Sequence, residues 1–172
     1  MTSTEEDDET LIGRYARGDA AAFDQLYRRY ELPVWRYLER NVGNQATSDE
    51  LLQEIWFALA RNAASLESAT RFRTRLFTLA HDRMTDTLRA RASKASPTAA
   101  ASRPAVAHDP ANALAQVIGH LPREQREAYL LQIEGQLNLR DIAEITESTV
   151  DTVQSRLHLA RVKLHDLLDE ET

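Results

Sequence analysis

Six arginines lie close together in residues 70–91, a stretch that is predicted to be a helix. Arginine neutralises phosphate charge, and aromatic side chains hold unpaired bases by stacking. This combination is typical of a surface that binds a separated nucleic-acid strand. The alternative is a solvated cationic helix with its phenylalanines in the core, and for Phe77 we favour the core. The candidate strand-binding residues are Arg71, Phe72, Arg73, Arg75, Arg83, Arg89 and Arg91.

A second group of polar side chains lies near the C-terminus. A short predicted helix over 139–145, a turn of about four residues and a long amphipathic helix over 149–168 form a helix-turn-helix pattern. In such a unit the start of the second helix enters the major groove of DNA. A helical hairpin with no nucleic-acid role has the same apolar spacing and is the alternative. The candidate groove-binding residues are Thr149, Thr152, Gln154, Ser155, Arg156, His158 and Arg161.

The chain contains no sequence motif that is typical of an enzyme. The sequence has no cysteine, so a disulfide, a thiolate nucleophile and a thiolate zinc site are excluded. The five histidines lack HExxH-like spacing, and there is no glycine-rich phosphate loop. We therefore predict that the protein is not an enzyme and has no metal and no cofactor. The net charge of -6 argues against DNA binding by the chain as a whole, whereas the arginine-rich helix predicts a local surface.

The elements that must position these residues are predicted to be all-α. Apolar residues recur at steps of three and four, and no segment alternates in the manner of a strand. Pro33 lies inside the second helical pattern and predicts a kink or break near Glu31. The predicted helices begin near residues 8, 20, 48, 70, 111, 122, 139 and 149.

We expect two small helical domains, 1–92 and 113–172, joined by a flexible linker over 93–112. Most of this linker is rich in alanine, and it holds three of the five prolines. Such residues break regular elements and bury too little apolar area to offset the entropy of ordering them. A buried extended loop is the alternative.

No apolar run approaches the ~18 residues that suggest a membrane span. The N-terminal MTSTEEDDET is acidic, whereas a secretory signal needs a basic and then an apolar stretch. The sequence therefore predicts a soluble protein of a reducing compartment, most simply the cytoplasm, with no membrane insertion.

Taken together and in order, these segments resemble a known family. The second region of a bacterial sigma factor is similar to RYARGDAAAFDQLYRRYELPVWRYL, SDELLQEIWFALAR and RFRTRLFTLAHDRMTDTLRARA. The fourth region is similar to LPREQREAYLLQIEGQLNLRDIAEITESTVDTVQSRLHLARVKLHDLL, residues 121–168. With a short linker and no third domain, the chain resembles the extracytoplasmic-function (ECF) group of the sigma-70 family over roughly residues 10–168.

The resemblance implies a factor that gives core RNA polymerase promoter recognition and strand opening. It assigns the candidate strand-binding residues to the promoter -10 element, the preceding loop 65–70 to a flipped base, and the candidate groove-binding residues to the -35 element. It also implies an anti-sigma factor that clamps the two domains. Binding of a coiled coil of core polymerase is implied for Asp49, Glu50, Leu51, Gln53 and Glu54, with Ile55 and Trp56 as further anchors. The alternative is that Asp49 and Glu50 merely favour the helix N-terminus and that Trp56 is core.

The first departure from the family pattern is Thr47, where the family usually has an acidic residue. A weaker polymerase contact is therefore expected. Phosphorylation of Thr47 would restore about two negative charges near the helix start. A Ser/Thr kinase is thus the second regulatory partner that the resemblance suggests, and a plain N-cap role for Thr47 is the alternative.

Other departures fall on the two DNA-binding helices. Arg75 and Asp82 replace a usual tryptophan and asparagine, which predicts an altered promoter preference. Glu147 replaces the glycine of the helix-turn-helix turn, at a cost of roughly 1 kcal/mol for a left-handed conformation. Weak or unusual -35 recognition is predicted because residues 113–172 carry eleven acidic and six basic side chains, net -5, including Asp151, with Gln154 and Leu159 in place of basic residues.

Two other functions remain open at this point. A stand-alone helix-turn-helix regulator would need affinity for duplex DNA by itself, which the acidic C-terminal segment makes poor. A sigma-like decoy would bind polymerase or an anti-sigma factor without initiating. The opening of a promoter by polymerase together with this protein separates the decoy from an initiation factor.

Overall fold

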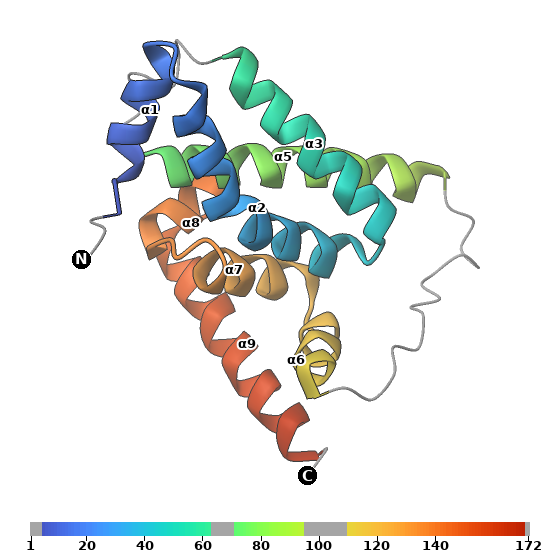
Figure 1. Cartoon of the computed structure of the whole chain (residues 1–172). Helices are drawn as coiled ribbons and strands as arrows, with labels where there is room; N and C mark the ends of the chain where they lie inside the picture. The colour runs from blue at the N-terminus through green and yellow to red at the C-terminus, as the bar shows by residue number, and fades with distance from the viewer. Residues whose placement is uncertain (1–4, 63–70, 95–109, 171–172) are drawn as a thin grey trace.

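The computed structural model describes residues 5–62, 71–94 and 110–170. Within these ranges the chain forms helices and no strand, which confirms the all-α prediction (Figure 1). The predicted base-binding loop 65–70 and residues 95–109 of the predicted linker lie outside the described residues. The helices are α1 (Asp8–Ala16), α2 (Ala20–Val42), α3 (Gln45–Arg61), α5 (Phe72–Lys94), α6 (Pro110–Gly119), α7 (Arg123–Ile133), α8 (Leu139–Ile145) and α9 (Val150–Glu170).

The first four helices pack around a shared apolar core. Each helix presents residues three and four apart to that core, and aromatic rings meet edge to face inside it, such as Tyr37 with Phe77 at 5.9 Å between ring centroids. Trp56 and Phe77 are both buried, so their predicted core positions are confirmed. The buried sides of α3 and α5 are therefore fixed in this core, and it positions the exposed sides of both helices.

Side-chain caps set the starts of these helices. Asp19 accepts a hydrogen bond from the Ala21 backbone at 3.1 Å and caps α2. Helix α3 begins three residues earlier than predicted, because Asn44 is its N-cap and accepts from the Thr47 backbone at 3.0 Å. The alternative that Thr47 is the N-cap is therefore wrong. Thr47 is the third residue of the helix.

Helix α2 stays helical through Pro33, so the chain does not break there. Figure 1 shows the helix changing direction partway along, as expected for a proline that lacks one backbone donor.

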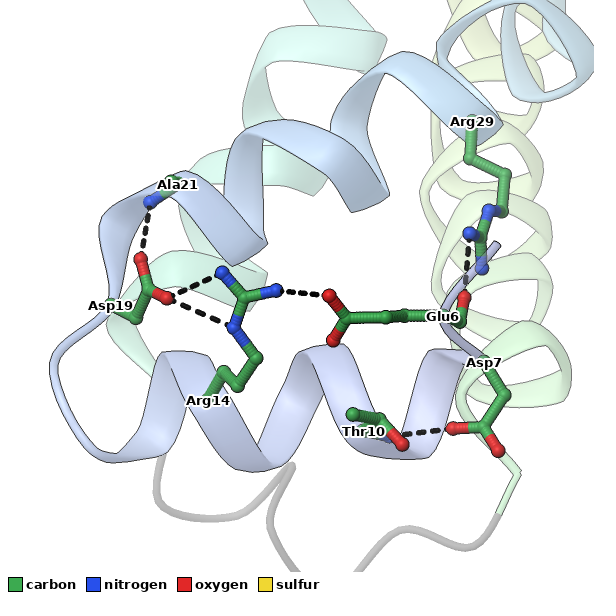
Figure 2. Close-up of polar contacts among 7 residues, drawn as sticks. All are labelled: Glu6, Asp7, Thr10, Arg14, Asp19, Ala21 and Arg29. Carbon is green, nitrogen blue, oxygen red and sulfur yellow. Dashed lines mark hydrogen bonds and ion pairs between the residues drawn. The ribbon is translucent and has the colours of Figure 1, made fainter. Parts of the chain in front are cut away.

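Residues 5–7, which precede α1 and are here called the N-terminal arm, are tied to α1 and α2 by charged side chains. Arg14 binds Asp19 and Glu6, each at 2.6 Å, and Arg29 donates to the Glu6 carbonyl at 2.8 Å (Figure 2). Asp7 caps α1 by accepting from the Thr10 backbone at 2.8 Å. These contacts fix the angle at which α1 meets α2.

Helices α8 and α9 form the predicted helix-turn-helix. The two helices pack against each other, and Ile142, Ala143, Val153 and Leu157 are buried. Thr149 caps α9, since its hydroxyl accepts from the Thr152 backbone at 3.1 Å. The predicted helix-turn-helix is thus confirmed, and Thr149 caps its second helix.

The two groups of helices contact each other. Helix α2 packs against α6 and α7, and α5 packs against α8. Helix α5 continues to Lys94 and α6 begins at Pro110, so both helices extend into the ends of the predicted linker 93–112. The division into domains 1–92 and 113–172 stays a prediction. In the part of the chain that the structure describes, no helix is long and apolar enough to cross a membrane.

Candidate nucleic-acid interface

The arginines of α5 do not share one face. At 3.6 residues per turn, Arg71, Arg75 and Arg89 fall on one exposed side of the helix axis, together with Asp82 and Asp86. We call these five residues the outer face of α5. Two carboxylates lie between its second and third cations, so it offers spaced phosphate contacts rather than a uniformly basic surface.

The other arginines of α5 are engaged with neighbouring helices. Arg73 donates to the Tyr30 hydroxyl at 3.2 Å, and Arg83 lies 3.3 Å from Glu54 of α3. Arg91 donates to the Thr47 hydroxyl at the start of α3. Each of these arginines therefore has a protein partner that competes with DNA for its donors.

One of these contacts, between Arg73 and Tyr30, extends to the start of α1. The Tyr30 hydroxyl donates to Asp8, and Asp8 also pairs with Arg29 at 2.6 Å. Burial, followed by the Asp8 contact, raises the pKa of Tyr30 to about 12, so the hydroxyl keeps its proton. Arg73 is thus linked through Tyr30 to Asp8, the first residue of α1.

Phe72 is not part of the outer face of α5. Its side chain is 2% exposed and packs edge to face on Tyr30, with ring centroids 5.6 Å apart. The DNA contact of Phe72 stays a prediction, and this burial favours a core role for the ring. The sequence spacing indicates this burial, because Phe72, Leu76 and Phe77 fall on one side of α5 at helical intervals, and that side faces the core.

A cavity of about 310 Å³ lies between the C-terminal end of α3 and α5. Asn62, Thr78 and Arg83 line it, together with Arg75 and Asp82. The last two residues are the two departures from the family pattern on this helix. Both side chains line the same cavity, and their spacing in the sequence did not reveal that they share it.

Helix α3 presents an acidic edge. Asp49, Glu50, Gln53 and Glu54 are exposed, and Asp49 accepts from the Trp35 indole nitrogen at 2.8 Å. The first turn of α3 contains no acidic residue, so the alternative that these carboxylates serve the helix N-terminus finds no support. We call Asp49, Glu50, Gln53 and Glu54 the acidic edge of α3.

Leu51, Ile55 and Trp56 lie on the opposite side of α3. Leu51 is 4% exposed, Ile55 and Trp56 are also buried, and all three pack in the core. The polymerase contacts of Leu51, Ile55 and Trp56 stay predictions, and this burial favours a core role for all three side chains. Sequence reasoning missed Phe57, which is 64% exposed and follows Gln53 and Glu54 at helical spacings of four and three. An apolar ring thus extends the acidic edge.

The outward side of α9 carries three of the seven candidate groove-binding residues. Gln154, Ser155 and His158 are exposed. Arg156 lies toward α7, 3.4 Å from Glu124, and Arg161 donates to Gln132 at 2.5 Å. Thr149 and Thr152 are joined hydroxyl to hydroxyl at 2.8 Å at the start of the helix. The structure therefore divides the predicted set into an outward group and a flank that faces the rest of the protein.

Glu147 occupies the left-handed turn between α8 and α9, with φ of 51°. We predict that Glu147→Gly raises the free energy of unfolding by up to about 1 kcal/mol, because glycine pays no steric cost there. Glu144→Gly, three residues earlier inside α8, should lower it by roughly 1 kcal/mol. Urea titrations of both variants give the comparison, and equal effects would contradict the strain at Glu147.

His81 of α5 is packed between the two helix groups. Its Nδ1 lies 2.9 Å from the Tyr37 hydroxyl. Burial lowers the pKa of His81, and nearby Arg123 lowers it further. The carboxylates of Glu127, Asp82 and Glu147 raise the pKa, but by less than burial lowers it. The imidazole is therefore neutral in the folded protein at neutral pH.

This burial predicts a pH dependence of stability. A histidine with a lowered folded-state pKa stabilises the fold above its ordinary value near 6.5, and that stabilisation is lost as the pH falls. The unfolding free energy should drop from pH 7.5 to 5.5, and His81→Gln should flatten the drop. The matched control is His158→Gln, at an exposed histidine. An unchanged slope in His81→Gln would refute the assignment.

Comparison with known proteins identifies the family. Sigma-70 region 2 matches residues 26–94, and Sigma-70, region 4 matches residues 111–164. The RNA polymerase sigma factor CarQ of Myxococcus xanthus is 30% identical over 170 residues, which cover 91% of this chain and 95% of CarQ. The chain belongs to the sigma-70 family of RNA polymerase sigma factors. This sigma factor is also 29% identical over 171 residues to the ECF RNA polymerase sigma factor SigM of Mycobacterium tuberculosis, covering 95% of this chain and 86% of SigM.

Solved structures show the same fold. CnrH, solved in complex with the cytosolic domain of CnrY, superposes with a TM-score of 0.69 at 23% identity, covering 96% of this chain and 99% of CnrH. The sigma factor RpoE from Bartonella quintana, solved with the anti-sigma factor NepR, gives 0.71 at 20% identity, covering 86% and 96%. The protein is therefore an ECF sigma factor, which directs promoter recognition and transcription initiation by RNA polymerase.

Proposed function

We propose that this sigma factor uses three separate surfaces in initiation. The outer face of α5 holds the separated non-template strand of the -10 element, the acidic edge of α3 binds core polymerase, and the outward side of α9 reads the -35 element. The observation that carries the proposal is the placement of Arg75 and Arg89 on one exposed side of a 23-residue helix, with exposed Arg71 directly before its first residue. Cations spaced along a rigid helix suit the repeating charge of a strand.

The acidic edge of α3 suits a basic partner surface. Its carboxylates can pair with arginines of a polymerase helix, and exposed Phe57 adds an apolar contact beside them. Because Glu54 pairs with Arg83 of α5, polymerase binding at this edge acts directly on a contact of the strand-binding helix.

The -35 contact is proposed to be weak. The outward side of α9 offers Gln154, Ser155 and His158 but few cations, and Arg156 is already paired with Glu124. Since phosphate contacts supply most of the affinity for DNA, a surface with so few charges positions the duplex only loosely.

In vitro transcription tests the proposal. Purified protein is added to core polymerase and genomic fragments, and the transcript starts are sequenced. Discrete starts with shared upstream elements support initiation through these surfaces. Core binding without any start would favour the sigma-like decoy, and duplex binding without core binding would favour a stand-alone regulator.

An anti-sigma factor is the regulatory partner that we propose first. The structural relative RpoE of Bartonella quintana was solved with the anti-sigma factor NepR. We further propose that the protein acts in the cytoplasm, where its polymerase is found, that it is not an enzyme, and that it needs no metal or cofactor.

A kinase is the second regulatory partner that we propose. Thr47 lies in the first turn of α3, and its hydroxyl accepts a hydrogen bond from Arg91 of α5. A phosphate there would be favoured both by the helix dipole and by the guanidinium, and it would add negative charge beside the acidic edge.

We predict that Thr47→Asp strengthens core binding roughly threefold to tenfold, as expected for about 0.5–1.5 kcal/mol from a first-turn charge. Thr10→Asp is the matched control, because Thr10 holds the equivalent third position of α1. Titration of labelled protein with core polymerase measures both. Equal affinities of Thr47→Asp, Thr10→Asp and the unchanged protein, with no phosphorylation of Thr47 in cells, would reject this regulation.

A further inference from the structure

The outward side of α9 is not built to read guanine. Arginine and lysine bind the O6 and N7 acceptors of guanine in the major groove. The two arginines nearest this side have protein partners, since Arg156 lies 3.4 Å from Glu124 and Arg161 donates to Gln132 at 2.5 Å. In α9, whose residues 150–170 the structure describes, the exposed residues of the first three turns are Val150, Asp151, Gln154, Ser155, His158 and Leu159. None of these six is an arginine or a lysine.

Asp151 and Gln154 favour adenine at the start of α9. Both are exposed in the N-terminal part of the helix, which reaches the base edges in a helix-turn-helix. A glutamine amide pairs at once with the N6 amino group and the N7 acceptor of adenine. The ionised Asp151 carboxylate only accepts hydrogen bonds, so it suits an amino group and repels the O6 and N7 acceptors of guanine.

Two exposed apolar side chains continue this side of the helix. Leu159 is 51% exposed and Val162 is 45% exposed, and they follow Ser155 at steps of four and three. Adjacent apolar side chains left in water mark a surface that a partner covers. The C5-methyl group of thymine is an apolar feature of the major groove, and apolar side chains contact it. Leu159 lies nearer the start of α9 than Val162, so it is the better placed of the two.

A single type of base pair supplies both features. An A·T pair presents N6 and N7 of adenine together with the methyl group of thymine, whereas a G·C pair presents the O6 and N7 acceptors and no methyl group. The polar start of α9 and its apolar continuation therefore suit the same class of DNA sequence.

We propose that α9 reads an upstream element rich in A·T pairs, in which Gln154 binds adenine, Asp151 disfavours guanine and Leu159 contacts a thymine methyl group. The inference rests on the proposed function, because it requires that α9 faces the -35 element during initiation. It makes Gln154 and Leu159 residues that determine specificity. Few phosphate contacts leave the affinity low, and the base contacts supply the selectivity.

Transcription from randomised promoters tests the base preference. A promoter identified by its transcript start is randomised across its upstream element, and a barcode in each transcript identifies its template. With core polymerase, the sigma factor should favour adenine at one position and thymine at another by at least about fivefold over guanine and cytosine. Gln154→Arg should change only the adenine position, to guanine. Leu159→Ala should remove only the thymine preference.

Two matched variants control for added charge and for lost apolar surface. His165→Arg places the same cation on α9, eleven residues after Gln154, at a side chain that is 75% exposed. Leu168→Ala removes another exposed leucine of the same helix. Both variants should keep both base preferences. Because all four substituted positions are exposed, thermal melting should show that each variant folds.

Modified bases locate the contacts at single atoms. The base 7-deazaadenine lacks the N7 acceptor, and deoxyuridine lacks the methyl group of thymine. The first should lower open-complex formation about fivefold with the unchanged protein and leave Gln154→Ala unaffected. The second should lower it about fourfold and leave Leu159→Ala unaffected. A loss in Leu159→Ala that deoxyuridine does not reproduce would assign Leu159 to a protein contact and overturn the methyl contact.

The remaining outcomes separate this inference from the proposed function. Starts whose upstream element is rich in guanine, or whose adenine preference survives Gln154→Arg, overturn the inference and leave initiation intact. Starts without any upstream preference overturn the inference together with the role of α9 at the -35 element. If no promoter gives a start, the proposed function is rejected, and the inference is rejected with it.

Discussion

Replacing Arg75 and Arg89 together by glutamate is expected to abolish transcript formation while core polymerase still binds. Both side chains lie on the exposed outer face of α5, about 20 Å apart along the helix at 1.5 Å per residue. Loss of a base or phosphate contact costs roughly 1–3 kcal/mol, and reversed charges add repulsion. Two such losses reduce open-complex formation by about 100-fold or more.

The measurement pairs a run-off transcription assay with a core-binding titration. Arg17→Glu with Arg28→Glu is the matched control, since both arginines are exposed on the first two helices and the change in net charge is the same. Full activity of the Arg75 and Arg89 variant would remove the outer face of α5 from strand capture. Equal loss in the control pair would indicate a general effect of charge.

Replacing Glu50 and Gln53 by arginine is expected to remove binding to core polymerase. Both residues project from the acidic edge of α3, and like charges brought together at an interface cost several kcal/mol. Binding should weaken by about 100-fold or more, and transcription should fall with it. Because both positions are exposed, the unfolding free energy should change by no more than about 0.5 kcal/mol.

Titration of fluorescent sigma factor with core polymerase measures this effect. Glu9→Arg with Asp24→Arg reverses two exposed acids on α1 and α2 and should bind normally. Unchanged affinity in the Glu50 and Gln53 variant would place the polymerase contact elsewhere. Phe57→Ala is the next variant in that case, because its ring is the largest exposed apolar group on α3.

The helical architecture could be predicted because it depends on local chemistry. The apolar period, the capping residues Asp19 and Thr149 and the left-handed turn at Glu147 all act within a few residues of sequence. The helix-turn-helix and its family resemblance follow from the same short-range pattern. Thr47 shows the limit, since a threonine near a helix start is a plausible cap until Asn44 is seen to hold that position.

Tertiary structure decided which of the predicted residues can reach a partner. Phe72 and Leu51 have suitable types for DNA and protein contacts, yet the sides of α5 and α3 that carry them pack into the core. Burial depends on how helices meet, and residues far apart in the sequence determine that.

The charged contacts between distant helices were equally beyond sequence reasoning. Arg91 with Thr47, Arg71 with Asp141 and Arg40 with Glu134 join residues 44, 70 and 94 positions apart. The sequence alone determined the helices, the family and the presence of a basic segment in an acidic chain. Only the folded chain decided that acidic residues lie against that segment, because long side chains find their partners across space and not along the sequence.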